Sequence, residues 1–385
     1  MIQRMSLLLL SLSLFSLATN VLRIQLGAFQ APLLFCASIF GLLYVRHWKI
    51  TKEAAILVGL LLGHIAVVLL RGMPNGNEAV AAYVIKLIAC IVFFGALHLY
   101  FSSLNSQESL AFFVKSTLIA SALLTIVYVF YYYFILNSLY LSASIGEVSE
   151  QGKNQIAQYL GALTVYSFFC FMQDSKPSSR RIYLFGFTAH LIGLLYTFSR
   201  SALISVVVTL TIFSILLLRR KDKGISRRLL LIVFFSVSVV AYLASQTVLL
   251  DEFWDNLASI FTLRDSGDST SIEVRSNLAA QAWQFFYQAP IWGLGTGEFL
   301  ARIGIVTHNS YLQLLVDNGI IGLATFVAVL LYALFLIKPA SNISYGAKPV
   351  VLFFLLSLIF INAIDSLIIY FFLAILIIPP YAKER

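Results

Sequence analysis

The feature that most constrains this chain is a series of apolar runs, each long enough to cross a membrane, separated by short polar segments. Of its 385 residues, 60% are hydrophobic and 11% are charged, which is too apolar for a water-soluble domain of this size. A helix of about 20 mostly apolar residues crosses the hydrocarbon core of a bilayer. The sequence therefore predicts an all-α integral membrane protein with about twelve transmembrane helices.

The expected spans can be placed to within a few residues. In chain order they are Leu7–Leu22, Ile24–Tyr44, Ala54–Leu70, Ala79–Phe101, Leu110–Leu136, Gln155–Met172, Ile182–Phe198, Ala202–Leu218, Leu229–Leu250, Gly319–Ile337, Val350–Ala363 and Leu367–Ile378. The first run could instead be a signal peptide that follows Arg4, but Ala18-Thr19-Asn20 makes a poor cleavage site. We therefore expect a retained helix.

The net charge of +9 could suggest a nucleic-acid partner, but its distribution indicates membrane topology instead. The basic residues gather in alternate loops, which the positive-inside rule places in the cytoplasm. These loops are Arg46–Lys49, Lys176–Arg181, Arg219–Arg228, Lys338–Lys348 and Lys383–Arg385. We therefore expect two cytoplasmic termini, outward-facing intervening loops, contacts with membrane lipids and no nucleic-acid partner.

The longest polar stretch runs from Asp251 to about Asp317 and faces outward on this topology. Within it, Thr270 and Glu273 have the spacing of a capping box, which predicts a helix that continues to about Gln288. Pro290 ends that helix, and a glycine-rich turn precedes a second short helix, at 310–316. The chain thus divides into nine spans (1–250), a helical outward loop domain (251–318) and three final spans (319–385).

Arginine predominates among the cations that this topology places outside. These arginines are Arg23, Arg71, Arg200, Arg264, Arg275 and Arg302, with Lys153 as the lone lysine. A guanidinium can bind phosphate oxygens with two parallel hydrogen bonds, whereas an ammonium is a point charge. Arg200 lies between two spans with almost no loop, and Arg275 lies near the start of the capped helix. Both could contact a diphosphate, although contacts with lipid headgroups or acidic loop residues are the alternative.

His308 is the one histidine expected in an outward loop. An imidazole can accept a proton from a sugar hydroxyl near neutral pH, which makes His308 a candidate general base. A polar contact before a helix is the alternative role. Asp365, at the outward turn between the last two spans, could orient His308 or pair with an arginine.

Other patterns exclude several kinds of site. Gly293-x-Gly295-x-Gly297 has the spacing of neither a phosphate-binding loop nor a dinucleotide fingerprint and is predicted to be a turn. No pair of histidines has zinc-ligand spacing, and Cys36, Cys90 and Cys170 all lie in apolar runs. We therefore expect neither a metal nor a cofactor.

Three stretches together resemble the O-antigen ligase and O-antigen polymerase superfamily in order, spacing and topology. They are Thr197–Ala202, Arg275–Gly297 and the run Thr307-His308-Asn309-Ser310-Tyr311-Leu312 that continues to Asp317-Asn318-Gly319. The resemblance covers about Lys153 to Asp317. The first five spans are similar to the family in hydropathy alone.

This resemblance implies a multi-spanning, GT-C-like, metal-independent inverting glycosyltransferase at the periplasmic face of a bacterial inner membrane. Its donor would be an undecaprenyl-diphosphate-linked glycan. By motif, His308 matches the family's essential histidine, and Arg200 and Arg275 match its diphosphate-contacting arginines. Lys153-Asn154 resembles a recurrent family feature. With Asn309, Asp365 and the less clearly matched Arg302, these two residues are expected to bind substrate.

The acceptor stays open at this point. A ligase would transfer the glycan to lipid A-core, a polymerase to another lipid-linked repeat unit, and a related enzyme to a pilin or another protein. We favour the ligase. A lipid-linked glycan flippase or transporter is the alternative of a different class, but such carriers usually have internal repeats around a midplane site, and none is evident here.

Overall fold

We describe the chain from a computed structural model. The residues that it describes are 23–26, 29–32, 50–72, 78–104, 107–136, 150–197, 199–218, 268–364 and 366–378. Their helices are α3 (Lys52–Gly72), α4 (Glu78–Ser102), α5 (Gln107–Phe130), α6 (Glu150–Gln173), α7 (Pro177–Leu195), α8 (Arg200–Leu218), α11 (Asp268–Gln288), α12 (Glu298–Ile303), α13 (Ser310–Leu331), α14 (Asn342–Ser357) and α15 (Leu367–Leu376). Short π-helical segments, η4 (Tyr131–Ile135) and η5 (Tyr332–Leu336), extend α5 and α13.

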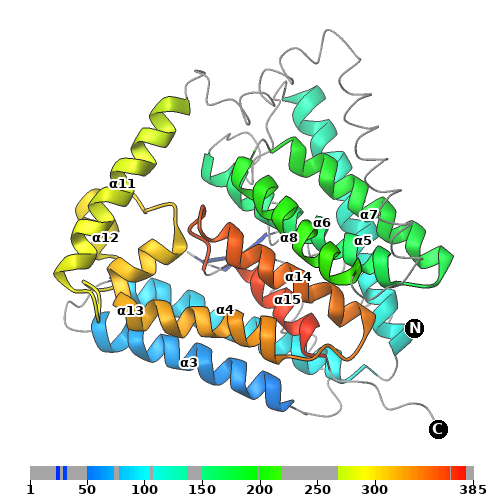
Figure 1. Cartoon of the computed structure of the whole chain (residues 1–385), viewed down its shortest axis with the longest axis horizontal. Coiled ribbons are helices and arrows are strands. Elements are labelled where there is room, and N and C mark those ends of the chain that lie inside the picture. Colours follow the sequence, from blue (N-terminus) through cyan, green and yellow to red (C-terminus); the bar gives the residue numbers. More distant parts are fainter. Residues whose placement is uncertain are drawn as a thin grey trace.

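The helices form two groups that are joined by α14 and α15 (Figure 1). In one group α3 packs against α4 and α13, and in the other α6 packs against α7 and α8. Helix α14 packs on α6 and α8, while α15 packs on α14 and α4. Helices α11 and α12 lie at one end of α13, beyond the two groups (Figure 1). Helices α14 and α15 therefore lie between the two groups, in contact with α4 on one side and with α6 and α8 on the other.

Four described helices are long and apolar enough to cross a membrane: Lys52–Gly72, Val80–Ser102, Glu108–Ile135 and Ser310–Leu336. The first three confirm the third, fourth and fifth expected spans. Ser201–Leu217, Asn342–Ser357 and Leu367–Leu376 are apolar but shorter. Exposed apolar side chains such as Ile204, Val207 and Val208 line the outer face of α8, as expected for a surface that contacts lipid. The chain is a membrane protein, and the total of about twelve spans stays a prediction.

Helices α6 and α7 lie where the sixth and seventh spans were expected, but they are less apolar than the four long helices. The physical reason is visible in α6, whose residues 156–172 are all buried inside the bundle. Because other helices cover it, α6 can carry buried polar side chains such as Gln158, Thr164 and Ser167. Burial by protein, rather than exposure to lipid, shapes its composition.

The structure corrects several expected boundaries. Residues 23–26 and 29–32 form an antiparallel hairpin, β1 (Arg23–Leu26) and β2 (Phe29–Pro32), where the start of the span Ile24–Tyr44 was expected. Only two residues, one of them a glycine, separate the strands in the sequence, and glycine favours two-residue hairpin turns. The rest of that span, and the spans Leu7–Leu22 and Leu229–Leu250, lie outside the described residues.

The C-terminal third agrees with one expectation and corrects two others. The expected short helix at 310–316 and the span Gly319–Ile337 are the two helical parts of α13, which meet at a kink where Gly319 has φ of 66° and ψ of −169°. Helix α14 starts at Asn342 rather than Val350, because Ser341 caps it by accepting a hydrogen bond from the Ser344 amide, which shortens the expected loop. The chain leaves helical conformation after Ser357, before the expected end of the eleventh span.

Candidate functional site

Helix α11 carries Arg275 and packs on the first part of α13. Leu278 of α11, Phe299 of α12, and Leu312 and Val316 of α13 belong to one buried cluster that is separate from the main core. Arg275 lies one turn before Leu278 and is partly buried. The helix begins at Asp268, two residues before the predicted Thr270, and the side-chain contacts of the predicted capping box lie outside the described residues.

The glycine-rich turn after α11 crosses α13 at its kink, and the backbones of the two segments are in direct contact. The Leu294 and Gly295 amides donate to the Val316 and Asp317 carbonyls at 2.8 and 2.9 Å. In return, the Ile320 amide donates to the Pro290 carbonyl at 2.9 Å. The predicted turn is therefore part of a hydrogen-bonded crossing, which fixes α11 relative to α13.

Gly293 and Gly319 make this crossing possible. A Cβ atom on Gly319 would lie 2.2 Å from the Ile291 carbonyl oxygen, and one on Gly293 would lie 2.4 Å from the Asp317 carbonyl. Both glycines have positive φ, at 72° for Gly293 and 66° for Gly319. Any side chain would separate the two backbones.

His308 lies immediately before α13 in a left-handed conformation, with φ of 55°. It is the only non-glycine residue with positive φ in the described ranges. Asn309 caps α13, and its Oδ1 accepts hydrogen bonds from the Tyr311 and Leu312 amides, each at 3.0 Å. The sequence analysis expected Asn309 to bind substrate. In the structure its oxygen caps the helix start next to His308, and its contact with substrate stays a prediction.

A chain of two hydrogen bonds joins the His308 loop to the kink of α13. The Thr307 amide donates to Gln313 Oε1 at 3.1 Å, and Gln313 Nε2 donates to Asp317 Oδ2 at 2.8 Å. Gln313 and Asp317 are both buried. Sequence reasoning singled out neither as a functional side chain, although their i, i+4 spacing places them on one face of the helix. They are positioning residues for the loop that carries His308.

The same loop is also fixed to the segment between α14 and α15. The Ser310 hydroxyl donates to the Ile361 carbonyl at 2.5 Å, and the Ser310 amide donates to the Leu358 carbonyl at 2.9 Å. The Tyr311 hydroxyl donates to the Leu355 carbonyl at 2.6 Å. Asp365 lies in this connection but outside the described residues, so its relation to His308 stays a prediction.

Arg200 is the first residue of α8, and its side chain lies outside the described part of the structure. The residues around it are fixed to the start of α6, because the Ser199 hydroxyl donates to Asn154 Oδ1 at 3.0 Å. Lys153 precedes Asn154 and is partly buried. The structure therefore brings three predicted site positions, Lys153, Asn154 and Arg200, to one junction.

This junction and His308 lie near the same end of α14. Gln158, one turn after Asn154, donates to the Ser357 hydroxyl at 3.4 Å. The next residue, Leu358, accepts the Ser310 amide two positions after His308. Residues far apart in the sequence thus meet around the last turn of α14.

Arg302 is held differently from the other candidates. Its Nε donates to Glu298 one turn earlier in α12, at 3.3 Å, and its guanidinium lies 5.5 Å from the centre of the Phe285 ring. Its side chain is 46% exposed. Arg302 therefore joins α12 to α11 through one hydrogen bond and one ring contact.

No group of three or more His, Cys, Asp or Glu side chains that could hold a metal occurs within the described ranges. Cys90 and Cys170 are buried free thiols.

Residues 182–327 match a protein family described as O-antigen ligase. The match runs from α7 into α13 and includes Arg200, Arg275, Arg302, His308 and Asn309. It confirms the resemblance to the O-antigen ligase and polymerase superfamily. A search of curated proteins finds no match to this chain.

Proposed function

We propose that this chain, which carries an O-antigen ligase family domain at residues 182–327, transfers a glycan from undecaprenyl diphosphate to lipid A-core. The observation that carries the proposal is the fixed presentation of His308 before α13, near the same end of α14 as the Arg200 junction. In this proposal the site faces the periplasm, both termini are cytoplasmic, and residues 251–318 form an outward loop domain. The donor glycan, the acceptor and the surrounding lipids are the partners.

The proposed reaction is a single displacement. His308 accepts the proton of the acceptor hydroxyl, whose oxygen forms a bond to the anomeric carbon of the donor. The bond from that carbon to the diphosphate oxygen breaks, and its electron pair leaves with undecaprenyl diphosphate. The attack inverts the anomeric configuration and needs neither a metal nor a covalent intermediate.

Arg200 and Arg275 have the second role in this proposal. Negative charge develops on the departing diphosphate, and guanidinium groups placed there lower the energy of the transition state. Lys153, Asn154, Asn309, Arg302 and Asp365 are proposed to bind substrate or to shape its site. For Asn309 that role is indirect, through the cap of α13. Arg302 contributes least in this proposal, because Glu298 and Phe285 already contact its charge.

The test is transfer by purified His308→Asn protein, with donor and acceptor supplied. Asparagine tolerates the left-handed conformation that His308 adopts, so this variant removes the base and leaves the backbone intact. We expect transfer to fall by about 10²- to 10⁴-fold with unchanged folding. Lys176→Gln, an exposed charge change before α7, is the matched control. Near-normal transfer by His308→Asn would refute the proposed mechanism.

The acceptor is tested in a deletion strain complemented with either protein, by displaying the lipopolysaccharide ladder on a gel. A ligase predicts that His308→Asn loses every attached chain while long lipid-linked polymer accumulates. Core that carries a single repeat unit would instead assign the polymerase function, which uses the same donor chemistry. An unchanged ladder would contradict both and favour a transporter or another glycan pathway.

A further inference from the structure

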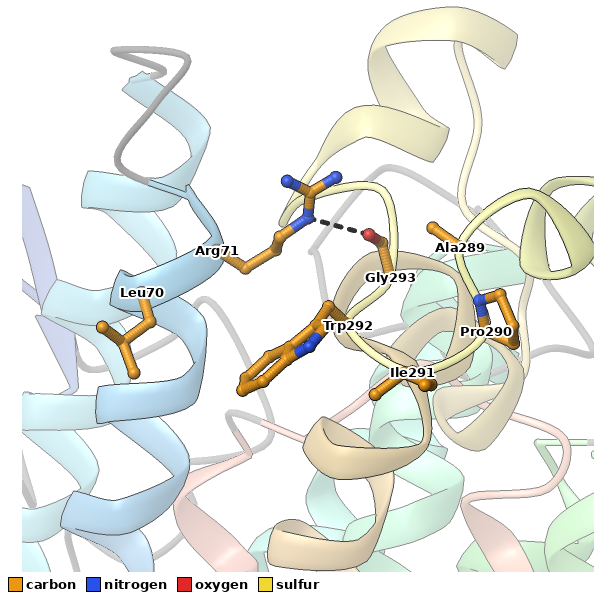
Figure 2. Close-up of a pocket in the computed structure, with 7 residues that line it drawn as sticks. All are labelled: Leu70, Arg71, Ala289, Pro290, Ile291, Trp292 and Gly293. Atoms are coloured by element: carbon orange, nitrogen blue, oxygen red, sulfur yellow. Dashed lines mark hydrogen bonds between the residues drawn. The ribbon is translucent and has the colours of Figure 1, made fainter.

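A cavity of about 580 Å³ lies between the end of α3 and the turn that follows α11 (Figure 2). Leu70 and Arg71 line it from α3, and residues 289–293 line it from the turn. Apolar side chains form most of its wall, and Arg71 is the one charged residue among those that line it. The cavity thus combines an apolar surface with a fixed cation.

Arg71 is held in place by the backbone of the turn. Its Nε donates to the Gly293 carbonyl at 2.8 Å, the bond drawn in Figure 2. Arg71 makes no other hydrogen bond or ion pair with the residues that the structure describes. Its two terminal nitrogens therefore offer a planar pair of donors beside the cavity, a geometry that suits the oxygens of a phosphate.

The position of Arg71 along α3 gives its depth in a membrane. Helix α3 has 21 residues and is about 31 Å long, close to the thickness of a bilayer's hydrocarbon core. Arg71 lies in its last turn. Its charge is therefore at the boundary between hydrocarbon and water, the depth at which phospholipid phosphates lie.

An exposed apolar face of α3 leads away from the cavity toward the middle of the membrane. Its residues repeat every three or four positions and are Ala55, Gly59, Leu62, Ala66 and Leu70. Leu70 is 71% exposed, and Ile291 and Trp292 beside it are 58% and 49% exposed. A tryptophan at the membrane boundary is typical of contact with lipid headgroups, and the face below it suits an acyl chain.

The cavity and the proposed base His308 lie at opposite ends of the segment Ser310–Asn318. Gly293 contacts α13 at Asp317–Asn318, whereas His308 precedes Ser310 at the other end of the same segment. Eight residues of helix separate Ser310 from Asn318, a distance of about 12 Å. The cavity is therefore about two helical turns from the proposed base along α13, and we infer that it serves a ligand other than the reacting donor.

We propose that this cavity binds the phosphate group of an anionic phospholipid, whose acyl chain lies along the exposed face of α3. The bound lipid stabilises the turn at 289–293 against α3 and so supports the crossing with α13. Both terminal nitrogens of Arg71 contact the phosphate, and Trp292 covers the glycerol region. The site is separate from the proposed transfer chemistry and does not depend on it.

The test measures lipid retained by the full-length protein after exchange from detergent into nanodiscs of phosphatidylcholine, with or without phosphatidylglycerol. Native mass spectrometry then counts bound lipids. We expect the wild type to retain phosphatidylglycerol. Arg71→Gln should bind it at least about tenfold more weakly, because the charge-assisted hydrogen bonds from the guanidinium to the phosphate are lost. Lys52→Gln, which removes one charge at the other end of α3, should retain it like the wild type.

Two further variants keep the test decisive if Arg71→Gln fails to fold. Arg71→Lys keeps the charge but loses the planar pair of donors, and Trp292→Ala opens the cavity wall without touching the Arg71 bond. Both should weaken retention. Equal retention by all variants would overturn the proposal. Displacement of the lipid by inorganic phosphate or by undecaprenyl diphosphate would also overturn it. The same holds if the protein forms a dimer that Arg71→Gln abolishes.

Discussion

The two ends of the segment Ser310–Asn318 are fixed in different ways. The first end, beside the proposed base His308, is held by side-chain hydrogen bonds, and the second end is held by contact between two backbones. At the first end, hydroxyls and amides of Ser310, Tyr311 and Gln313 hold the loop that carries His308. At the second end, backbone lies against backbone at Gly293 and Gly319. Side-chain bonds can be lost one at a time, whereas two crossing backbones admit no side chain between them. Mutations should therefore have graded effects at the first end and large effects at the second.

The largest effect on stability is expected for Gly319→Ala. Its φ of 66° and ψ of −169° suit glycine alone, and the added Cβ would meet the Ile291 carbonyl. We expect a loss of about 3 kcal/mol or more in the free energy of unfolding, or no folded protein. Thermal unfolding in nanodiscs measures it.

Gly304→Ala is the matched control for that prediction. Gly304 also has positive φ, at 80°, but a Cβ there would meet nothing within 4 Å. Gly304→Ala should therefore lower the free energy of unfolding only by the cost of placing alanine in the left-handed conformation, about 1 to 2 kcal/mol. Equal losses at Gly304 and Gly319 would show that the crossing itself contributes nothing.

A smaller effect, mainly on activity, is expected for Gln313→Ala at the first end. The change removes the acceptor of the Thr307 amide and the donor to Asp317, so the His308 loop loses its connection to the kink. We expect about 1 to 3 kcal/mol of destabilisation and a fall in kcat of about tenfold, with KM little changed. A fall in activity that follows the folded fraction alone would argue against a positioning role.

A smaller effect on stability is expected for the hydrogen bond between Ser199 and Asn154, at the junction before α8. Ser199→Ala and Asn154→Ala each remove one partner of the bond between the Ser199 hydroxyl and Asn154 Oδ1, and Ser199→Ala also removes the contact with the Ser201 hydroxyl at 3.2 Å. A double-mutant cycle on unfolding should give a coupling energy of about 1 kcal/mol. Additive losses would mean that this bond does not fix the start of α8, where Arg200 lies.

The smallest effect is expected for Arg302→Gln. The Arg302–Glu298 pair is partly exposed and connects residues of the same helix, so its loss should cost less than about 1 kcal/mol. Transfer activity should stay within a few-fold of the wild type. A loss as large as that of His308→Asn would instead make Arg302 a principal contact of the diphosphate.

Much of the fold follows from local patterns. The spans Ala54–Leu70, Ala79–Phe101 and Leu110–Leu136 were predicted within a few residues, because a membrane-exposed helix must be apolar along its length. Helix α11 ends at Gln288 as predicted, before Pro290. The prediction was wrong for the start of the span Ile24–Tyr44, where the two strands lie, because hydropathy alone does not distinguish an apolar helix from an apolar hairpin.

The candidate site was predicted only in part. The resemblance to the family made His308, Arg200 and Arg275 candidates, and the matched range includes all three, while their roles stay predictions. Gln313 and Asp317 were missed because a buried polar pair within a helix has no sequence signal of its function. Asn309 also caps α13 in the structure, a role that its position before an apolar helix could have indicated, and its expected contact with substrate stays a prediction.

The sequence by itself determined that the chain enters a membrane, where several of its helices lie, and which residues are candidates for the proposed glycan transfer. These properties depend on composition and on neighbours within one or two turns. Only the tertiary structure decided that the turn at Gly293 crosses the kink at Gly319, and that Asn154 and Ser310 both lie near the end of α14. Such contacts join residues far apart in the chain, and they depend on how whole helices pack, which no local pattern specifies.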